Sequence, residues 1–166
     1  MKTFYTCLAV FACFAVSRFV PHPPNFTSVQ ALSFYLPAIL GLKFIPVVFL
    51  SFVITDIFIG FHQTLFFTWG SIILIGLISK YFIFSTSSRI FGSLVGCGVF
   101  FIFTNFGVWL TGGYGYNING LLTCYVAAIP FFGFSLISTI IFSFLIEILI
   151  FIKKITWIKK FNFKKY

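Results

Sequence analysis

Three short segments place polar side chains inside an otherwise apolar chain, and these side chains are the ones suited to hold a small molecule. They are "SRFVPHPPNFT" at residues 17–27, "TDIFIGFH" at 55–62 and "TNFGVWL" at 104–110. A charge, several amides and an aromatic surface are what a polar or anionic ligand needs in a mostly apolar pocket. With a tyrosine from a later loop, the candidate ligand-binding residues are Arg18, His22, Asn25, Asp56, His62, Asn105, Trp109 and Tyr116.

The aspartate in the second segment needs a partner. An ionised aspartate within an apolar span costs about 2.5–3.5 kcal/mol to insert, so Asp56 should face the bundle interior. We expect Arg18 to be its cation. Two interpretations stay open: an ion pair that only fixes helix packing, or charges at a cavity open to the outside.

The third segment offers an amide and an indole on one helical face, since Asn105 and Trp109 are four residues apart. Together they would give a ligand a hydrogen bond and a stacking surface. The structural alternatives are an interhelical hydrogen bond for Asn105 and a position in the interfacial aromatic belt for Trp109.

Three prolines in the first segment predict a stiff, extended chain. Pro21, Pro23 and Pro24 lack a backbone N–H and disfavour helix in the preceding residue. A stiff segment loses little entropy on closing, so it is suited to form the wall or lid of a site. His22 and Asn25 would then point inward, although His22 could equally be a cap or interface residue.

The sequence gives little support for a catalytic site or a metal site. The two histidines and Asp56 lack the spacing of metal ligands, and no Ser/His/Asp order or paired carboxylates occur. We therefore expect no metal, no cofactor and no enzyme, with His22 or His62 as a general base the weakest reading. The cysteines show no Cys-x-x-Cys spacing and are interpreted as small buried residues: Cys7, Cys13, Cys97 and Cys124.

The elements that position these residues must be membrane helices. Of 166 residues, 60% are hydrophobic and 8% charged, whereas soluble domains have about 25% charged residues. Much of the +9 charge is a lysine-rich tail at 153–166 that follows an apolar segment. Such a tail meets anionic lipid, so membrane lipid is the expected partner and nucleic acid is not.

Hydrophobic length predicts six transmembrane helices in one domain, residues 1–152. Five windows can cross a core of roughly 30 Å, and a sixth at 29–42 is either a short kinked span or a re-entrant segment. Residues 119–132 are expected to form a half-helix at the membrane surface, broken at Pro130. The five windows are 3–20, 44–61, 64–84, 90–111 and 134–152.

With six spans, ten basic residues fall on one side and only Arg18 on the other, so both termini are predicted to be cytoplasmic. The outer ends then carry the polar cluster. A cleaved signal peptide is the alternative for the first span. It would remove part of that cluster.

Small residues predict close helix packing at two places. Gly92 and Gly96 form a small-x-x-x-small pair, for contact within the bundle or with another subunit. A second stripe on the first span, Ala9, Cys13 and Ser17, allows the same two kinds of contact, packing within the bundle or docking of another subunit. Glu147 should reach Lys153 or Lys154, or meet a partner protein.

The segments "SRFVPHPPNFTSVQAL", "TDIFIGFH", "TNFGVWL" and "LLTCYVAAIPFF" together resemble an uncharacterised family of small bacterial inner-membrane proteins. That family is distantly similar to the substrate-binding S components of energy-coupling factor (ECF) transporters. The resemblance implies a six-helix bundle, a pocket near the outer surface gated by the first loop, and a coupling subunit docked on the first helix. An acidic residue expected after "IPFF" is replaced by Ser135, Ser138 and Thr139.

The sequence thus favours a transporter's substrate-binding subunit, which would take a small polar or anionic metabolite or vitamin from the outer side. The chain has no nucleotide-binding motif, so ATP-driven uptake would need a coupling transmembrane subunit and ATPases. The alternative is a non-transporting scaffold or assembly protein whose polar cluster only holds the helices together.

Overall fold

The structure, a computed structural model, describes residues 2–162, with side chains for residue 5 and residues 7–153. Over this range the chain forms helices and turns and no strand, which confirms the all-α class. Lys164 and Lys165 of the predicted tail lie outside the described residues. The elements are α1 (Lys2–Phe19), α2 (Val29–Leu40), the 3-10 helix η1 (Leu42–Phe44), α3 (Ile45–Ile59), α4 (Leu65–Ile78), the 3-10 helix η2 (Ser79–Phe82), α5 (Thr86–Leu110) and α6 (Ile118–Asn162).

Four helical stretches are long and apolar enough to cross a membrane. They are Leu42–Ile59, Leu65–Phe82, Thr86–Leu110 and Ile118–Lys153. The apolar stretches of α1 and α2 are shorter, at Cys7–Phe19 and Val29–Leu40. The class of membrane protein is therefore supported by four helices, two fewer than the six predicted spans.

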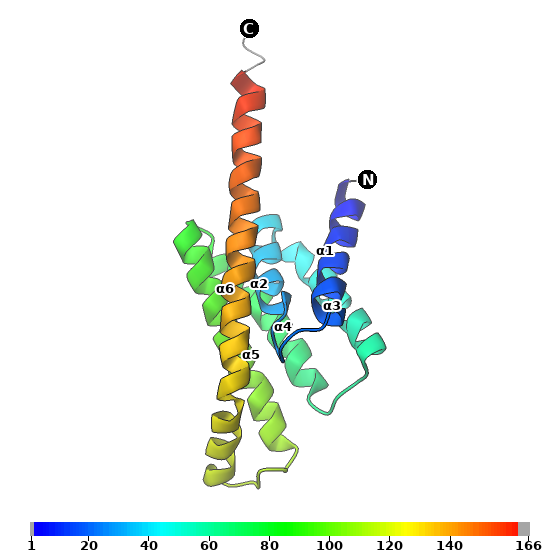
Figure 1. The fold of residues 1–166 in the computed structure, drawn as a ribbon, viewed down its shortest axis with the longest axis vertical. Coiled ribbons are helices and arrows are strands. Elements are labelled where there is room, and N and C mark those ends of the chain that lie inside the picture. The colour runs from blue at the N-terminus through cyan, green and yellow to red at the C-terminus, as the bar shows by residue number, and fades with distance from the viewer. Residues whose placement is uncertain (1, 163–166) are drawn as a thin grey trace.

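The short helix α2 lies at the centre of the bundle. It contacts α1, α3, α4, α5 and α6, and Figure 1 shows it between α1 and α6. Ala31, Phe34 and Tyr35 on this helix are at most 1% exposed. Its twelve residues extend only about 18 Å at 1.5 Å per residue. The helix ends at Gly41, whose φ of 95° is open to glycine without strain.

Glycines on α5 let neighbouring aromatic and aliphatic side chains approach its backbone. A Cβ on Gly92 would lie 2.5 Å from Cβ of Phe82 and 2.6 Å from Cζ of Phe34. One on Gly96 would lie 3.0 Å from a methyl carbon of Ile75. The predicted Gly92 and Gly96 stripe therefore serves packing within the bundle.

The prediction of a helix break at Pro130 is wrong. Helix α6 runs without interruption from Ile118 to Asn162, with Pro130 inside it. Proline removes one intrahelical hydrogen bond, but the flanking turns remain helical and the helix packs along α5. The apolar segment 119–132 and the last predicted span thus form one long helix, drawn from yellow to red in Figure 1.

The helices alternate in direction, so polar residues far apart in sequence gather at one end. The beginning of α1 and the end of α6 point to the same end of the molecule (Figure 1). The connections at that end are flanked by basic residues, namely Lys43 in η1, Lys80 in η2 and Arg89 in the first turn of α5. Arg18 and Asp56, near the last turns of α1 and α3, belong to the opposite end.

Candidate functional site

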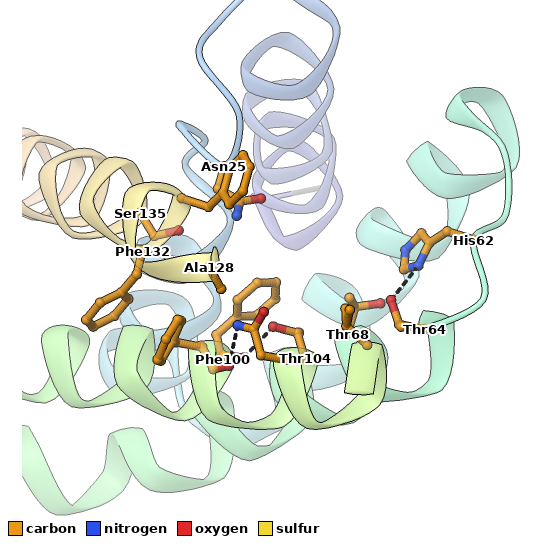
Figure 2. A pocket seen from close by; sticks show the side chains of 13 residues that line it. Asn25, His62, Thr64, Thr68, Phe100, Thr104, Ala128, Phe132 and Ser135 are labelled. Carbon is orange, nitrogen blue, oxygen red and sulfur yellow. Dashed lines mark hydrogen bonds between the residues drawn. The ribbon is translucent and has the colours of Figure 1, made fainter. Parts of the chain in front are cut away.

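A cavity with two adjoining lobes opens at the end of the bundle opposite the basic connections. The lobes have volumes of about 310 and 270 Å³. They share four lining residues, so they form one continuous depression. Those shared residues are Asn25, His62, Thr68 and Phe100. Figure 2 shows the first lobe, with Asn25 and Ser135 on one side and His62 and Thr64 on the other.

Arg18 lines the second lobe, and its charge is paired with that of Asp56, which lies outside the lobe lining. Nη2 of Arg18 lies 2.6 Å from Oδ1 of Asp56, and Nη1 donates to Thr55 Oγ1 and to the Phe52 carbonyl. The guanidinium also lies 4.3 Å from the centre of the Phe52 ring. The arginine side chain is thus held on α3 by four contacts.

Asp56 is fully buried and has both carboxylate oxygens occupied. Its Oδ1 takes the arginine, and its Oδ2 accepts a hydrogen bond from Trp69 Nε1 at 2.8 Å. A buried charge of this kind is tolerated only when it is paired and hydrogen-bonded. Asp56 therefore joins α1, α3 and α4 and positions Arg18 without itself lining the cavity. Trp69 was not among the predicted site residues.

The proline-rich linker forms a tight turn at the cavity mouth. Phe26 N donates to the Pro23 carbonyl at 3.0 Å, and Asn25 adopts a φ of 63°. Asparagine is one of the few residues that accepts this left-handed conformation. The turn brings Asn25 to both lobes and His22 to the second. Nδ1 of His22 contacts the Pro23 carbonyl at 2.7 Å; a carbonyl only accepts, so Nδ1 is the donor.

The connection from α3 to α4 supplies the far side of the cavity. His62 is exposed and lines both lobes, and its Nδ1 lies 3.0 Å from Thr64 Oγ1. Thr68, one turn into α4, is 8% exposed and donates to the Leu65 carbonyl. Both threonines were missed from the sequence. Hydroxyls that bond their own helix are common in membrane helices, so residue type alone does not single them out.

Asn105 on α5 faces the first lobe. Its Nδ2 donates to the Phe101 carbonyl at 2.7 Å, and neighbouring Thr104 donates to the Phe100 carbonyl. Dashed lines in Figure 2 mark these bonds. One of the two amide N–H groups is thereby used within the helix, so Asn105 can offer its second N–H and its Oδ1 to a ligand.

Trp109 and Tyr116 lie outside the cavity lining and stabilise the connection between α5 and α6. Trp109 Nε1 donates to the Gly115 carbonyl at 2.9 Å, and Tyr116 Oη donates to the Leu110 carbonyl at 3.3 Å. Their rings meet edge to face, 6.2 Å apart. The aromatic surface of the first lobe comes instead from four phenylalanines, Phe100, Phe101, Phe131 and Phe132.

Gln30 is the most informative residue that sequence reasoning missed. It lines the second lobe from the first turn of α2 and is 2% exposed. Its Oε1 has no hydrogen-bond partner among the described residues, a situation that costs about 1–3 kcal/mol. An uncharged amide within an otherwise apolar predicted helix was the available signal in the sequence.

The opposite end of the bundle holds a second ion pair. Arg89 Nε and Nη2 each lie 2.6 Å from one carboxylate oxygen of Glu147, and Thr86 Oγ1 donates to the same group. Arg89 is thus a partner of Glu147 that the sequence prediction, Lys153 or Lys154 or a partner protein, did not include; the Lys154 side chain lies outside the described residues. Glu147 is 8% exposed, and the planar guanidinium matches its two oxygens in a bidentate pair.

Hydroxyl residues on one face of α6 connect the two ends of the bundle. Ser135 lines the first lobe, and Ser143 Oγ lies 2.9 Å from Ser93 Oγ on α5. Ser138 and Thr139 between them are fully buried. The residues that stand in place of the expected carboxylate thus form an uncharged polar stripe.

The predicted docking stripe on α1 is partly open. Ala9 and Cys13 are exposed, whereas Ser17 Oγ lies 2.7 Å from Ser28 Oγ at the start of α2. The four cysteines are free thiols, with Cys97 and Cys124 buried and Cys7 half-buried. Among the described residues, no three His, Cys, Asp or Glu side chains gather as metal ligands.

One protein family matches this chain. Its description is "Family of unknown function (DUF6580)", and the match covers residues 1–157. No curated protein sequence and no solved structure matches the chain.

Proposed function

The chain belongs to the DUF6580 family of unknown function, and from its geometry we propose that it is the substrate-specific binding subunit of a membrane transporter. In this proposal it captures a small polar metabolite or vitamin, neutral or anionic, from the outer side of a bacterial inner membrane. The observation that carries the proposal is the two-lobed cavity, where side chains from six helices and a proline-stiffened linker converge.

The proposed topology has six spans and both termini in the cytoplasm. Basic residues Lys43, Lys80 and Arg89 belong to one end of the bundle, and the cavity lies at the other. The positive-inside rule then turns the cavity outward. Helix α2 is shorter than the bilayer core, but its central position shields it from lipid and its flanking segments complete the crossing.

Likeness to ECF S components remains part of this proposal. Two features favour it: a polar pocket near the outer end beside the first connection, and the small residues Ala9 and Cys13 exposed on α1. Docking of a coupling subunit at that stripe would link the binder to ATPases. The chain carries no nucleotide-binding motif of its own.

A scaffold protein is the second candidate, and one observation favours it. Arg18 and Asp56 satisfy each other and link three helices, which is what a purely structural pair would do. The cavity distinguishes the two, because a scaffold has no need of a depression lined by amides and hydroxyls.

A native mass spectrum of protein purified from its own membranes in mild detergent, with no ligand added, tests the proposal. A binder should retain an extra mass of a few hundred daltons that is lost in an Asn105→Leu variant. Co-eluting ATPase subunits would extend the result to a transporter. A bare mass that stays unchanged after incubation with metabolite extracts would contradict binding and favour the scaffold.

A further inference from the structure

The charges at the cavity are balanced within the protein, and from this we infer that the ligand is an uncharged, ring-bearing molecule with hydrogen-bonding groups at its edge. The inference rests on the proposed binding function and narrows its substrate class. It excludes the anionic metabolites that an unpaired arginine would favour.

The first step concerns the single strong cation at the site. Among the residues lining the two lobes, Arg18 is the only lysine or arginine. Its Nη2 is taken by Asp56, and its Nη1 by Thr55 and the Phe52 carbonyl. An anion would have to compete with a carboxylate that lies 2.6 Å away and pairs with no other cation among the described residues. Arg18 thus adds little net positive charge to the cavity.

The second step concerns the groups that remain. Apart from Arg18 and two histidines, the polar lining consists of amides and hydroxyls, which recognise neutral donors and acceptors. Each histidine already has Nδ1 in contact with a neighbour, the Pro23 carbonyl for His22 and Thr64 for His62. The amides and hydroxyls are Asn25, Thr27, Gln30, Thr64, Thr68, Thr104, Asn105 and Ser135.

The third step is the unpaired amide oxygen of Gln30. Buried polar atoms in proteins nearly always have a partner, so one without a partner at a cavity wall calls for a donor. Oε1 of Gln30 lacks one in the described chain, and it lies just beneath the cavity surface with almost no accessible area. A ligand N–H or O–H group would satisfy this oxygen after a small movement of the Gln30 side chain, whereas a carboxylate or phosphate group has no hydrogen to give it.

The fourth step is the apolar wall. Phe100, Phe101 and Phe132 line the first lobe, and the Phe101 and Phe132 rings are themselves stacked with centroids 4.5 Å apart. Aromatic walls of this kind favour flat rings. The lobe volumes of about 310 and 270 Å³ are at the small end for ligand pockets.

The test uses the full chain purified from its own membranes. Small molecules released by denaturation are identified by mass spectrometry, and the purified compound is then rebound to variants. Gln30→Leu should weaken rebinding about tenfold, as expected for one hydrogen bond. Gln63→Leu is the matched control, because Gln63 is exposed in the connection before α4 and lies outside both lobes.

Replacing the ion pair as a unit separates its structural role from ligand binding. The double variant Arg18→Met/Asp56→Leu should still bind the released compound within a few-fold of the wild type. Circular dichroism checks that the double variant is folded. If it is not folded, the charge of the released compound by itself supports or overturns the inference.

The outcomes are distinct. A neutral, ring-containing compound that the folded double variant retains supports the inference. A released carboxylate or phosphate compound, or binding lost in the folded double variant, overturns the inference while leaving the binding function standing. If no compound is released, the proposed function itself fails and the inference fails with it.

Discussion

Arg18 and Asp56, 38 residues apart in the sequence, form one ion pair whose carboxylate has its second oxygen bound by Trp69. The aspartate is fully buried and the arginine is partly buried. Each charge is therefore stabilised in the bundle only while its partner is present. Removing one leaves an uncompensated charge in the bundle, whereas removing both leaves none.

Asp56→Ala should lower the free energy of unfolding by about 3–5 kcal/mol, the range for breaking a buried pair. Thermal unfolding in detergent measures the change. The control is Arg18→Met/Asp56→Leu, which should recover part of the loss, because it removes both charges but still leaves Trp69 Nε1 without its acceptor. Equal instability of the single and double variants would contradict a pairwise role for these residues.

Arg89 and Glu147 should be coupled by about 0.5–3 kcal/mol, as expected for charged groups in direct contact. A double-mutant cycle with Arg89→Met and Glu147→Leu, followed by unfolding in detergent, gives this coupling. Lys153→Met serves as the comparison and should show a smaller coupling to Glu147→Leu. A larger coupling of Glu147 to Lys153 than to Arg89 would contradict the Arg89 pairing and favour the lysine expected from the sequence.

Gly92→Ala should destabilise the protein by about 1–3 kcal/mol, because the added methyl would overlap Phe82 and Phe34 in a packed interior. Gly98→Ala is the matched control on the same helix. A Cβ there meets nothing within 4 Å, so the change should be neutral or slightly stabilising, by up to about 1 kcal/mol. Similar melting temperatures for both variants would show that α5 does not pack as described.

A six-span topology and a four-span topology place the proline-rich linker on opposite sides of the membrane. In a cysteine-free background, Pro23→Cys and Gly113→Cys should react with a membrane-impermeant maleimide on intact spheroplasts. Lys43→Cys and Lys80→Cys should react only after permeabilisation. If only the four long helices cross, Pro23→Cys and Lys43→Cys will label from the same side.

Some features of this protein follow from local sequence. Hydrophobic length and charge content are additive over a short window, so the membrane class and the positions of α1 to α5 were predicted to within a few residues. Charge burial is also a local requirement: an aspartate in an apolar helix must find a cation, which is why the Arg18 and Asp56 pair was foreseen as one interpretation.

The direction of side chains depended on tertiary structure. Membrane helices are apolar on most faces, so hydrophobic periodicity gives little information about which face points inward. Trp109 was expected in a pocket, but its indole N–H is used by the Gly115 carbonyl in the adjacent loop. Gln30 lines the cavity because α2 lies at the centre of the bundle, and nothing near it in sequence indicates that position.

Long-range packing explains two features of α6 that local sequence did not predict. Glu147 has lysines six and seven residues away, yet it pairs with Arg89, 58 residues earlier, because α5 and α6 pack along their lengths. The same packing supports a continuous helix through Pro130, where the local rule predicts a break. Local sequence determined which segments are apolar helices and which charges need partners. Only the packing of six helices decided which partners they meet and which neutral groups line the cavity, since these contacts join residues from distant parts of the chain.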